Sequence, residues 1–221
     1  MQRLFDIKKI QLEMVRDRGY QISPEEEQIL HTNLSGFINC VNELAAGNPR
    51  TSVRSLLSRS YISENPDANG VRLRMLVYYG GKTNPQQKQV SADVVREFIG
   101  FTQRGMNEAI LIVDAPLSPT GNNELSALVL TKWQVFFDAQ LTYNPTTHVD
   151  TPRHELLSPE ETREKLHELK ADLSKLLIIK SDDPVVRYYG WKAGGLVRVY
   201  RNDESVSILS SRSINYRVIY G

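Results

Sequence analysis

The chain has 221 residues, which is enough for one large domain or two small ones with a real core. A hydrophobic content of 40% and a charged content of 24% exclude a disordered chain. The formal net charge of +1 excludes a globally basic nucleic-acid-binding protein, so DNA contact would need a local patch. The only cysteine, Cys40, excludes an internal disulfide framework, and we expect it to be a small buried side chain. No apolar run is long enough to span a bilayer and no signal-peptide layout occurs, so we expect a protein that is not secreted.

Two helices are predicted at the start of the chain. Apolar side chains recur at helical spacing over residues 4–15, and Gly19 is placed to end this helix. Ser23, followed by a proline, is a typical N-cap for a second helix. Glu26 stands three residues after Ser23, so we expect its side chain to complete a capping box.

The middle of the chain alternates between strand and helix patterns. Strand, helix, strand, helix and strand are predicted over residues 71–79, 90–101, 109–113, 124–131 and 133–137. This alternation is typical of a mainly parallel sheet covered by helices. Residues 143–153 contain two prolines and few apolar side chains, which favours a domain boundary there. We therefore predict an α/β N-terminal domain over residues 1–145 and a small α+β domain over residues 148–221.

The second domain has a short helix with both ends marked. Asp183 is placed to cap it, Pro184 fits its first turn, and Gly190 can end it in the left-handed conformation. We expect an apolar helix face formed by Val185, Val186 and Tyr189. A turn at Gly194-Gly195, a strand over residues 196–201 and a second strand from residue 214 complete the domain.

These residues also carry a resemblance to a known family. The C-terminal signature of one polymerase subunit family resembles a motif of this chain, Asp183-Pro184-Val185-x-x-Tyr188-x-Gly190-x-Lys192-x-Gly194. The resemblance continues after the motif with Val197-x-Val199 and Arg201. That subunit is the fifth-largest subunit of eukaryotic nuclear RNA polymerases, which has a counterpart in archaeal RNA polymerase. Residues 151–158, with Pro152-x-His154, and residues 14–22 resemble two further segments of that family.

The resemblance implies a non-catalytic, structural subunit of a multisubunit DNA-directed RNA polymerase. It implies an N-terminal jaw domain of restriction-endonuclease-like topology near downstream duplex DNA, and a C-terminal assembly domain docked on the largest subunit beside neighbouring small subunits. It implies a nuclear location, or a nucleolar one for the ribosomal-RNA polymerase; a viral member would be in the cytoplasm or virion. No cofactor, metal, membrane or small-molecule substrate is expected.

The resemblance also implies which residues form contacts. Those expected at the polymerase interface are Pro152, His154, Pro184, Arg187, Tyr188, Gly190, Trp191, Lys192, Gly194 and Arg201. Those expected in a loop that approaches downstream DNA are Ser118, Pro119 and Thr120, although Ser-Pro-Thr-Gly is equally typical of an ordinary turn.

The chain departs from the family pattern in its last third. The usual Leu-Pro-Arg-Ile run is replaced at residues 176–179 by Leu-Leu-Ile-Ile, and Ala193 and Gly195 replace a basic and a polar residue. The segment after Arg201 keeps Glu204 but lacks the family's nearby glycine. We therefore hypothesise a divergent paralogue that serves one polymerase class, or the equivalent subunit of a large DNA virus.

Two other functions compete with this interpretation. One is a stand-alone transcription adaptor that binds polymerase transiently. The other is a Mg²⁺-dependent nuclease, which needs an Asp and a Glu-x-Lys on adjacent strands. Asp114 ends a predicted strand, but Leu130 and Thr131 precede Lys132 where the motif requires an acid, so we do not expect a nuclease.

Overall fold

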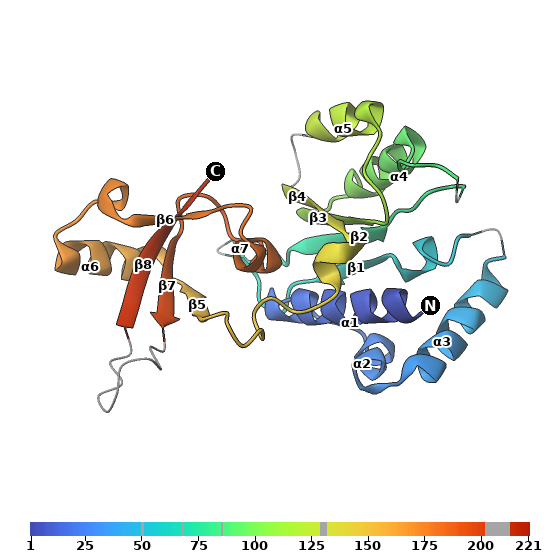
Figure 1. Cartoon of the computed structure of the whole chain (residues 1–221), viewed down its shortest axis with the longest axis horizontal. Helices are drawn as coiled ribbons and strands as arrows, with labels where there is room; N and C mark the ends of the chain where they lie inside the picture. Colours follow the sequence, from blue (N-terminus) through green and yellow to red (C-terminus); the bar gives the residue numbers. More distant parts are fainter. Residues whose placement is uncertain (50, 68, 85, 129–131, 202–212) are drawn as a thin grey trace. The chain divides into compact units, whose positions relative to one another are not determined.

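The computed structural model describes the whole chain except residues 50, 68, 85, 129–131 and 202–212. It divides into two compact units, residues 1–143 (unit 1) and residues 144–221 (unit 2), coloured in chain order in Figure 1. None of the helices in the described ranges is long and apolar enough to cross a membrane.

Unit 1 contains a mixed sheet with helices on both faces. Its strands are β1 (Arg59–Ile62), β2 (Arg74–Tyr79), β3 (Glu108–Val113) and β4 (Lys132–Phe137), in the spatial order β1-β2-β3-β4. Its helices are α1 (Gln2–Asp17), α2 (Pro24–His31), α3 (Leu34–Gly47), α4 (Ala92–Thr102) and α5 (Pro119–Ser126), with 3₁₀ turns η1 (Ser55–Leu57) and η2 (Asp138–Leu141). The pairs β2–β3 and β3–β4 are parallel, while β1–β2 is antiparallel. The prediction of a mainly parallel sheet with flanking helices is confirmed.

The core of unit 1 lies in two layers, one on each side of the sheet. Helices α4 and α5 cover one face and α1 lies on the other (Figure 1). Successive side chains of β2 point to opposite faces and so enter different layers. Leu76 and Tyr78 belong to the layer that includes Phe98 of α4. Met75 and Val77, which point the other way, are equally buried. Because both faces of β2 are covered, its sequence is a continuous run of apolar residues.

The first two helices begin and end close to the predicted residues. Gly19 has φ +79°, a left-handed conformation that favours glycine, directly after α1. The Ser23 side chain accepts a hydrogen bond from the Glu26 N–H at the start of α2. The Glu26 side chain does not return to Ser23, however, because its carboxylate is engaged by the side chains of Lys8 and Tyr61. The predicted capping box is therefore wrong at this helix.

Other features of unit 1 differ from the predictions. Helix α3 is additional to the two helices predicted at the start of the chain. Strand β1 was not predicted, because only four residues alternate there and only Tyr61 is buried. Helix α5 begins at Pro119 rather than at Glu124, since Ser118 provides its N-cap; the predicted end at residue 131 lies outside the described residues. Cys40 is partly exposed rather than buried.

Unit 2 is a second four-stranded mixed sheet. Its strands are β5 (Arg153–Leu156), β6 (Leu177–Lys180), β7 (Leu196–Arg201) and β8 (Ser213–Tyr220), in the order β5-β7-β8-β6. The helices are α6 (Pro159–Leu169) and α7 (Pro184–Tyr189), with the 3₁₀ turn η3 (Leu173–Lys175). Among the strand pairs that the described residues of unit 2 form, β6–β8 is parallel and β5–β7 and β7–β8 are antiparallel. The core cluster is Ile179, Val186, Val197, Val199 and Ile219, and Trp191 packs against it.

The burial of β8 differs from the pattern that its sequence suggested. The sequence suggested that the face with Ile214 and Tyr220 is buried, but these side chains are 46% and 68% exposed. Ile219, which points to the other face of the strand, is 1% exposed. The register with β6 explains this, because Ile219 is directly opposite the buried Ile179. The face that joins the core is therefore the one that carries Ile219.

Candidate protein interface in unit 2

Helix α7 is held at both ends by the residues that the sequence marks. The N–H groups of Val185 and Val186 donate to Asp183 Oδ1 at 2.9 and 3.4 Å, which satisfies two of the first unpaired amides. Gly190 has φ +66° and ends the helix in the left-handed conformation. The Trp191 N–H then donates to the Val186 carbonyl at 3.1 Å, so the chain turns back tightly and fixes where Trp191 leaves the helix.

The glycine turn after α7 depends on both of its glycines. Gly194 has φ +85°, and its N–H donates to the Ile219 carbonyl at 2.9 Å. A Cβ on Gly195 would lie 2.9 Å from Leu156 Cδ1 and 3.2 Å from the Lys192 carbonyl oxygen. Gly194 is therefore required by conformation and Gly195 by close packing.

The structure separates the expected interface residues into buried and accessible ones. Tyr188 is only 1% exposed, and its hydroxyl accepts a hydrogen bond from Asn144 Nδ2 at 3.0 Å. Tyr189, expected on the apolar face, is half-buried and stacks on Trp191 with 4.6 Å between ring centroids and 9° between planes. The roles assigned to the two tyrosines are therefore reversed: Tyr188 belongs to the interior and Tyr189 extends the accessible aromatic surface.

Four of the expected residues are accessible on or beside α7. Pro184 and Lys192 are exposed, while Arg187 and Trp191 are half-buried. We call these four residues the α7 surface. Burial lowers the pKa of the Arg187 guanidinium, although Asp182 acts in the opposite direction. Trp, Arg and Tyr side chains that are already partly immobilised are typical anchors of protein interfaces.

Pro152 and His154 lie at the opposite end of the unit-2 sequence, in and just before β5. His154 Nδ1 lies 2.6 Å from the Pro152 carbonyl oxygen, and His154 is half-buried opposite Val199 of β7. Burial lowers the pKa of the His154 imidazole; the Pro152 carbonyl and Asp183 oppose this, and Arg217 reinforces it. Arg201 ends β7, where its backbone is opposite Ser213.

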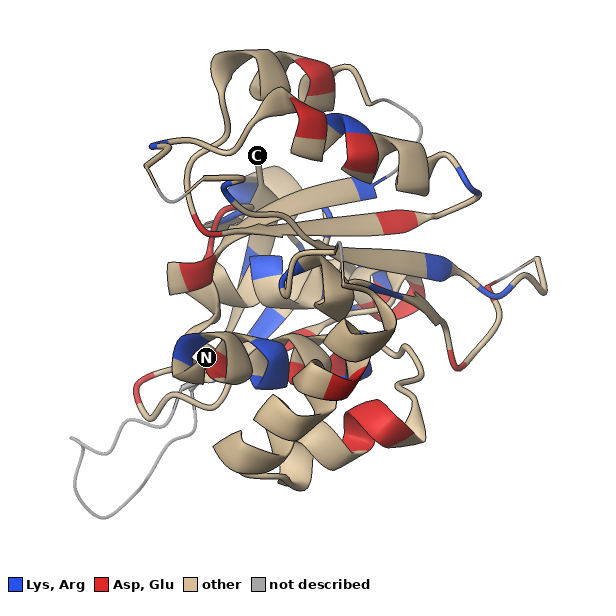
Figure 2. Cartoon of the chain, turned by 90° about the vertical axis from the view of Figure 1, so that its right-hand side faces the viewer, with Lys and Arg blue, Asp and Glu red and all other residues tan. Residues whose placement is uncertain are grey.

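The expected DNA-approaching residues of unit 1 form a helix start rather than a free loop. Ser118 Oγ accepts a hydrogen bond from the Gly121 N–H at 3.2 Å, Pro119 occupies the first turn of α5, and Thr120 is exposed. The N-terminus of a helix is favourable for an anion such as a phosphate. The charges on α4 and α5 are Asp93, Glu97 and Glu124 against Arg96, so the helix pair behind this start is acidic (Figure 2).

The residues that come nearest to a nuclease motif lie at opposite ends of the sheet in unit 1. Asp114 follows β3, and its carboxylate accepts a hydrogen bond from the Lys82 N–H at 3.1 Å. Lys132 begins β4, and its Nζ lies 2.9 Å from Glu108 at the start of β3. Among the described residues, no three acidic, histidine or cysteine side chains form a group that could hold a metal ion.

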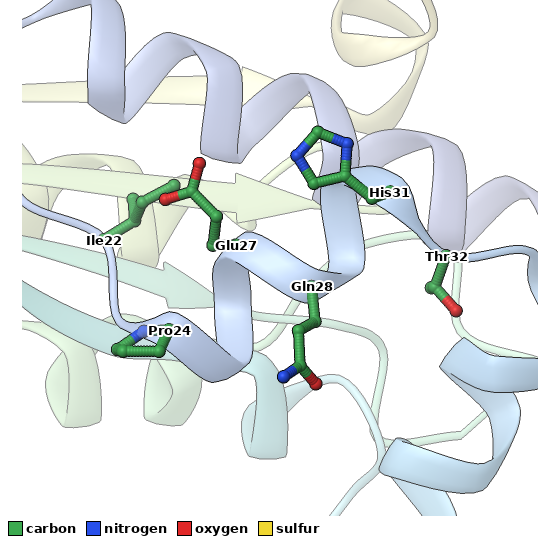
Figure 3. Close-up of a pocket in the computed structure, with 6 residues that line it drawn as sticks. All are labelled: Ile22, Pro24, Glu27, Gln28, His31 and Thr32. Carbon is green, nitrogen blue, oxygen red and sulfur yellow. The ribbon is translucent and has the colours of Figure 1, made fainter.

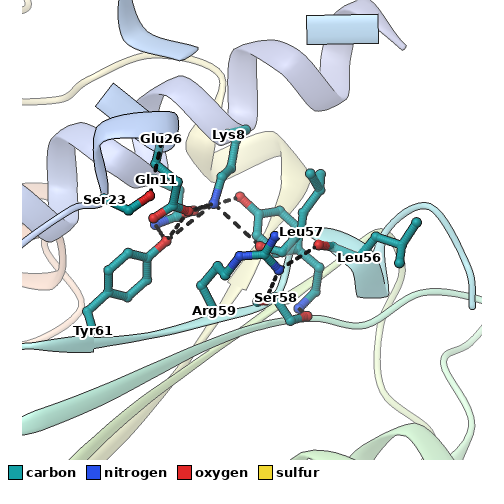
Figure 4. A network of polar contacts seen from close by, with 10 residues as sticks. Lys8, Gln11, Ser23, Glu26, Leu56, Leu57, Ser58, Arg59 and Tyr61 are labelled. Carbon is teal, nitrogen blue, oxygen red and sulfur yellow. Dashed lines mark hydrogen bonds and ion pairs between the residues drawn. The ribbon is translucent and has the colours of Figure 1, made fainter. Parts of the chain in front are cut away.

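The most buried charge of unit 1 belongs to a closed polar network (Figure 4). Lys8 Nζ lies 2.8 Å from both Gln11 Oε1 and Glu26 Oε1, and 3.3 Å from the Tyr61 hydroxyl. Tyr61 in turn donates to Glu26 at 2.8 Å. Burial lowers the pKa of Lys8, and Glu26 opposes that change. A catalytic lysine needs a proton or lone pair free for substrate, whereas this ammonium group already meets three side-chain acceptors, so we assign it to structure.

Two hollows lie near α2. One, of about 520 Å³, is a surface concavity along α2, where Figure 3 shows the lining side chains spread around its rim (Ile22, Pro24, Glu27, Gln28, His31 and Thr32). Pro24, Glu27, Gln28 and His31 are exposed. The other, of about 470 Å³, lies between α2 and α3, and its lining is part apolar, as at Phe37 and Leu57, and part charged, as at Lys8 and Glu26. In the second hollow Lys8 and Glu26 are bound to each other in the network described above, so we assign its buried charges to structure rather than to catalysis.

The comparisons with known proteins agree with the division into two units. The family model described as "RNA polymerase Rpb5, C-terminal domain" matches residues 143–219, which is nearly all of unit 2. The chain is 28% identical to the Caenorhabditis briggsae protein "DNA-directed RNA polymerases I, II, and III subunit RPABC1", over 98% of this chain and 95% of that one. Residues 143–219 therefore match the Rpb5 C-terminal domain, and the chain as a whole is similar to RNA polymerase subunits of this type.

Other Rpb5 relatives extend the comparison beyond one lineage. The Dictyostelium discoideum protein "DNA-directed RNA polymerases I, II, and III subunit rpabc1" is 28% identical over 98% of this chain and 96% of its own length. The Arabidopsis thaliana protein "DNA-directed RNA polymerases IV and V subunit 5B" is 25% identical over 94% of this chain and 85% of its own. The Rpb5 resemblance noted in the sequence is therefore confirmed, and the relatives match unit 1 as well as unit 2.

Proposed function

We propose that this chain is a non-catalytic structural subunit of a multisubunit, nuclear DNA-directed RNA polymerase. The supporting observation is that the Rpb5 C-terminal model covers unit 2 while subunits of nuclear polymerases align with almost the entire chain. A match over both units favours a polymerase subunit over an adaptor that borrowed one module. Transcription is accordingly the process in which we expect the chain to act.

We further propose that unit 2 is the assembly domain and docks on the largest subunit. The α7 surface supports this proposal, because it presents Arg187 on a helix whose two ends are fixed, with Trp191 and Lys192 directly after that helix. Stacking of Trp191 on Tyr189 holds the indole in place before binding, which reduces the entropy that docking must overcome. Pro152, His154 and Arg201 are proposed as further contacts of the same domain.

We propose that unit 1 is a jaw domain with restriction-endonuclease-like topology, placed near downstream duplex DNA. Three parallel strands between helical layers support this assignment of topology. The N-terminus of α5, with Ser118, Pro119 and Thr120, is the proposed contact, since its amides and hydroxyls could meet a phosphate without reading a base. The acidic surface of α4 and α5 confines such a contact to the helix start.

We infer that the chain serves one polymerase class rather than all of them. The departures from the family pattern at residues 176–179, Ala193 and Gly195 lie in unit 2, where a subunit shared by several enzymes would be constrained by every partner. The names of the chain's relatives differ in the polymerases that they give, with IV and V in one and I, II and III in two others, which supports specialisation among such subunits.

Purification from native cells through a tag on the full chain, with a high-salt wash and quantitative mass spectrometry, tests this proposal. A core subunit is expected in near-equimolar amount with the two largest subunits of one polymerase class. Loss of the polymerase on washing would favour the transient adaptor. Equal recovery with every polymerase class would refute the class-specific assignment while leaving the subunit assignment intact.

A further inference from the structure

Strand β6 is an outer strand of the unit-2 sheet, and its first two residues are apolar and exposed. Leu177 and Ile178 are 61% and 56% exposed and, as successive strand residues, point to opposite faces. Outer strands are usually protected from pairing by a proline or a charged side chain. In β6, with the sequence Leu-Ile-Ile-Lys, the charged residue is at the end, so Leu177 and Ile178 lack that protection.

The backbone of β6 offers hydrogen bonds along its outer edge. The Ser181 N–H, just beyond the strand, donates to the Tyr220 carbonyl of β8 at 2.8 Å. Because successive residues direct their backbone groups to opposite edges, Ile179 also faces β8, whereas Ile178 and Lys180 face outward. The Lys180 carbonyl already accepts from the Asp183 N–H at 3.1 Å. Both backbone groups of Ile178 and the N–H of Lys180 are therefore directed at the open edge.

A basic side chain lies one strand inward from this edge, with part of its hydrogen-bonding capacity unused. Arg217 of β8 is directly opposite Leu177 of β6 in the sheet register, so the two side chains share one face. Arg217 Nε is buried and meets no hydrogen-bond acceptor in the described part of the chain. A buried donor without an acceptor is costly, and a carboxylate is the group that best matches a guanidinium.

We propose that the outer edge of β6 binds an extended segment of a larger subunit of the same polymerase. Apolar side chains of that segment would cover Leu177 and Ile178, its backbone would pair with Ile178, and an Asp or Glu would pair with Arg217. This mode is β-augmentation, in which backbone pairing provides affinity and side chains provide specificity. The proposal rests on the proposed function, but it concerns a surface whose residues are distinct from the α7 surface.

A second copy of this chain fits the edge less well than a different subunit. A four-residue strand is only about 13 Å long, so pairing two of them forms few hydrogen bonds. Stable interfaces usually bury about 1,200 Å² or more, which this edge alone cannot provide. A second β6, with the sequence Leu-Ile-Ile-Lys, also brings no carboxylate to Arg217. The edge is therefore suited to strengthening a larger interface formed with another subunit.

Site-specific cross-linking in the assembled enzyme tests the proposal. The full chain would carry photoreactive benzoylphenylalanine in place of Ile178 or, as a matched control, of Val149, which is 93% exposed in the same unit. Polymerase purified from irradiated cells is expected to show a cross-link from position 178 to an extended segment of a larger subunit with an acidic residue close by. Position 149 is expected not to reach that segment. A cross-link to a second copy, or none at all in fully recovered polymerase, would overturn the proposal.

Substitutions in the full chain give an independent measurement. Ile178→Arg and Arg217→Gln are expected to lower retention in the polymerase at high salt by about tenfold, whereas Val149→Arg leaves it unchanged. Each purified variant should keep the wild-type melting temperature, which separates docking from folding. Retention of Ile178→Arg at the wild-type level would overturn the proposal. If wild-type chain itself brings down no polymerase, the proposed function fails, which distinguishes that failure from failure of the edge alone.

Discussion

The indole of Trp191 stacks on the ring of Tyr189, with centroids 4.6 Å apart and ring planes within 9° of parallel. Gly190, between the two residues, makes this stacking geometrically feasible because it reverses the chain in the left-handed conformation. Trp191 also packs against the core cluster of unit 2, so one side chain connects the interior with the α7 surface. A substitution at Trp191 is therefore expected to affect the α7 surface as well as the packing of unit 2.

Trp191→Ala is expected to weaken docking by about 2 kcal/mol or more, since a buried aromatic anchor contributes that much at an interface. Trp191→Phe should retain most of the affinity because a phenyl ring can still stack on Tyr189. Salt-resistant recovery with polymerase measures the effect. Tyr143→Ala, an exposed aromatic of unit 1, is the control. Equal recovery of Trp191→Ala and wild type would contradict docking through the α7 surface.

Tyr188→Phe is expected to lower the free energy of unfolding by about 1 kcal/mol without affecting docking. The substitution removes the acceptor that Asn144 Nδ2 uses inside unit 2 and leaves the ring in place. Chemical denaturation measures stability, and polymerase recovery measures docking. Reduced recovery of a variant that is folded at the assay temperature would mean that Tyr188 has the contact role that the family resemblance implies.

Lys8→Met is expected to destabilise unit 1 by about 3–5 kcal/mol, because it leaves the Glu26 carboxylate buried without its cation. Adding Glu26→Gln should recover a large part of that loss, since the pair is then removed together. Lys88→Met, at an exposed loop position, controls for loss of a positive charge. Thermal and urea unfolding give the comparison. Additive losses in the double variant would contradict the account of a coupled pair.

Stability should fall as pH decreases through the region below about 6.5, the ordinary pKa of histidine. His154 has a lowered pKa in the folded chain. As the pH decreases, its imidazole therefore takes up a proton in the unfolded chain before it does so in the folded chain, which stabilises the unfolded chain relative to the folded one. The loss continues until the pH passes below the folded-state pKa. Melting temperatures between pH 7.5 and 5.5 should therefore fall less for His154→Gln than for wild type. An identical slope for both would contradict this assignment, and His31→Gln, at an exposed position, controls for histidine loss in general.

Gly194→Ala is expected to cost about 1–2 kcal/mol, because its φ of +85° is unfavourable for any residue with a Cβ. Gly100→Ala is the matched control, since Gly100 lies in α4 and an added Cβ there would meet nothing within 4 Å. It should be stabilising by about 0.5–1 kcal/mol through helix propensity. Urea unfolding of the two variants separates conformational strain from the general effect of adding a methyl group.

Much of the fold follows from local sequence signals. Asp183, Pro184 and Gly190 mark α7 because capping and left-handed residues act within a few positions. Strands β2 and β3 were predictable because they are continuous apolar runs that both layers cover. Signals of this kind do not depend on distant parts of the chain.

The errors arise where a distant contact decides the outcome. Glu26 was expected to close a local capping box, but a lysine eighteen residues away binds its carboxylate. Tyr188 is buried because it meets Asn144, forty-four residues earlier, and the phase of β8 follows from its pairing with β6. The α7 surface was therefore predictable as a region, whereas the division of its side chains between interior and surface was not.

Cryo-electron microscopy of polymerase isolated through a tag on this chain tests the central claim most directly. The account predicts one copy of the chain per enzyme, with unit 2 against the largest subunit and Trp191, Arg187 and Lys192 of the α7 surface inside the contact. Enzyme particles that lack the chain, or that hold it through unit 1 with unit 2 free, would contradict the account.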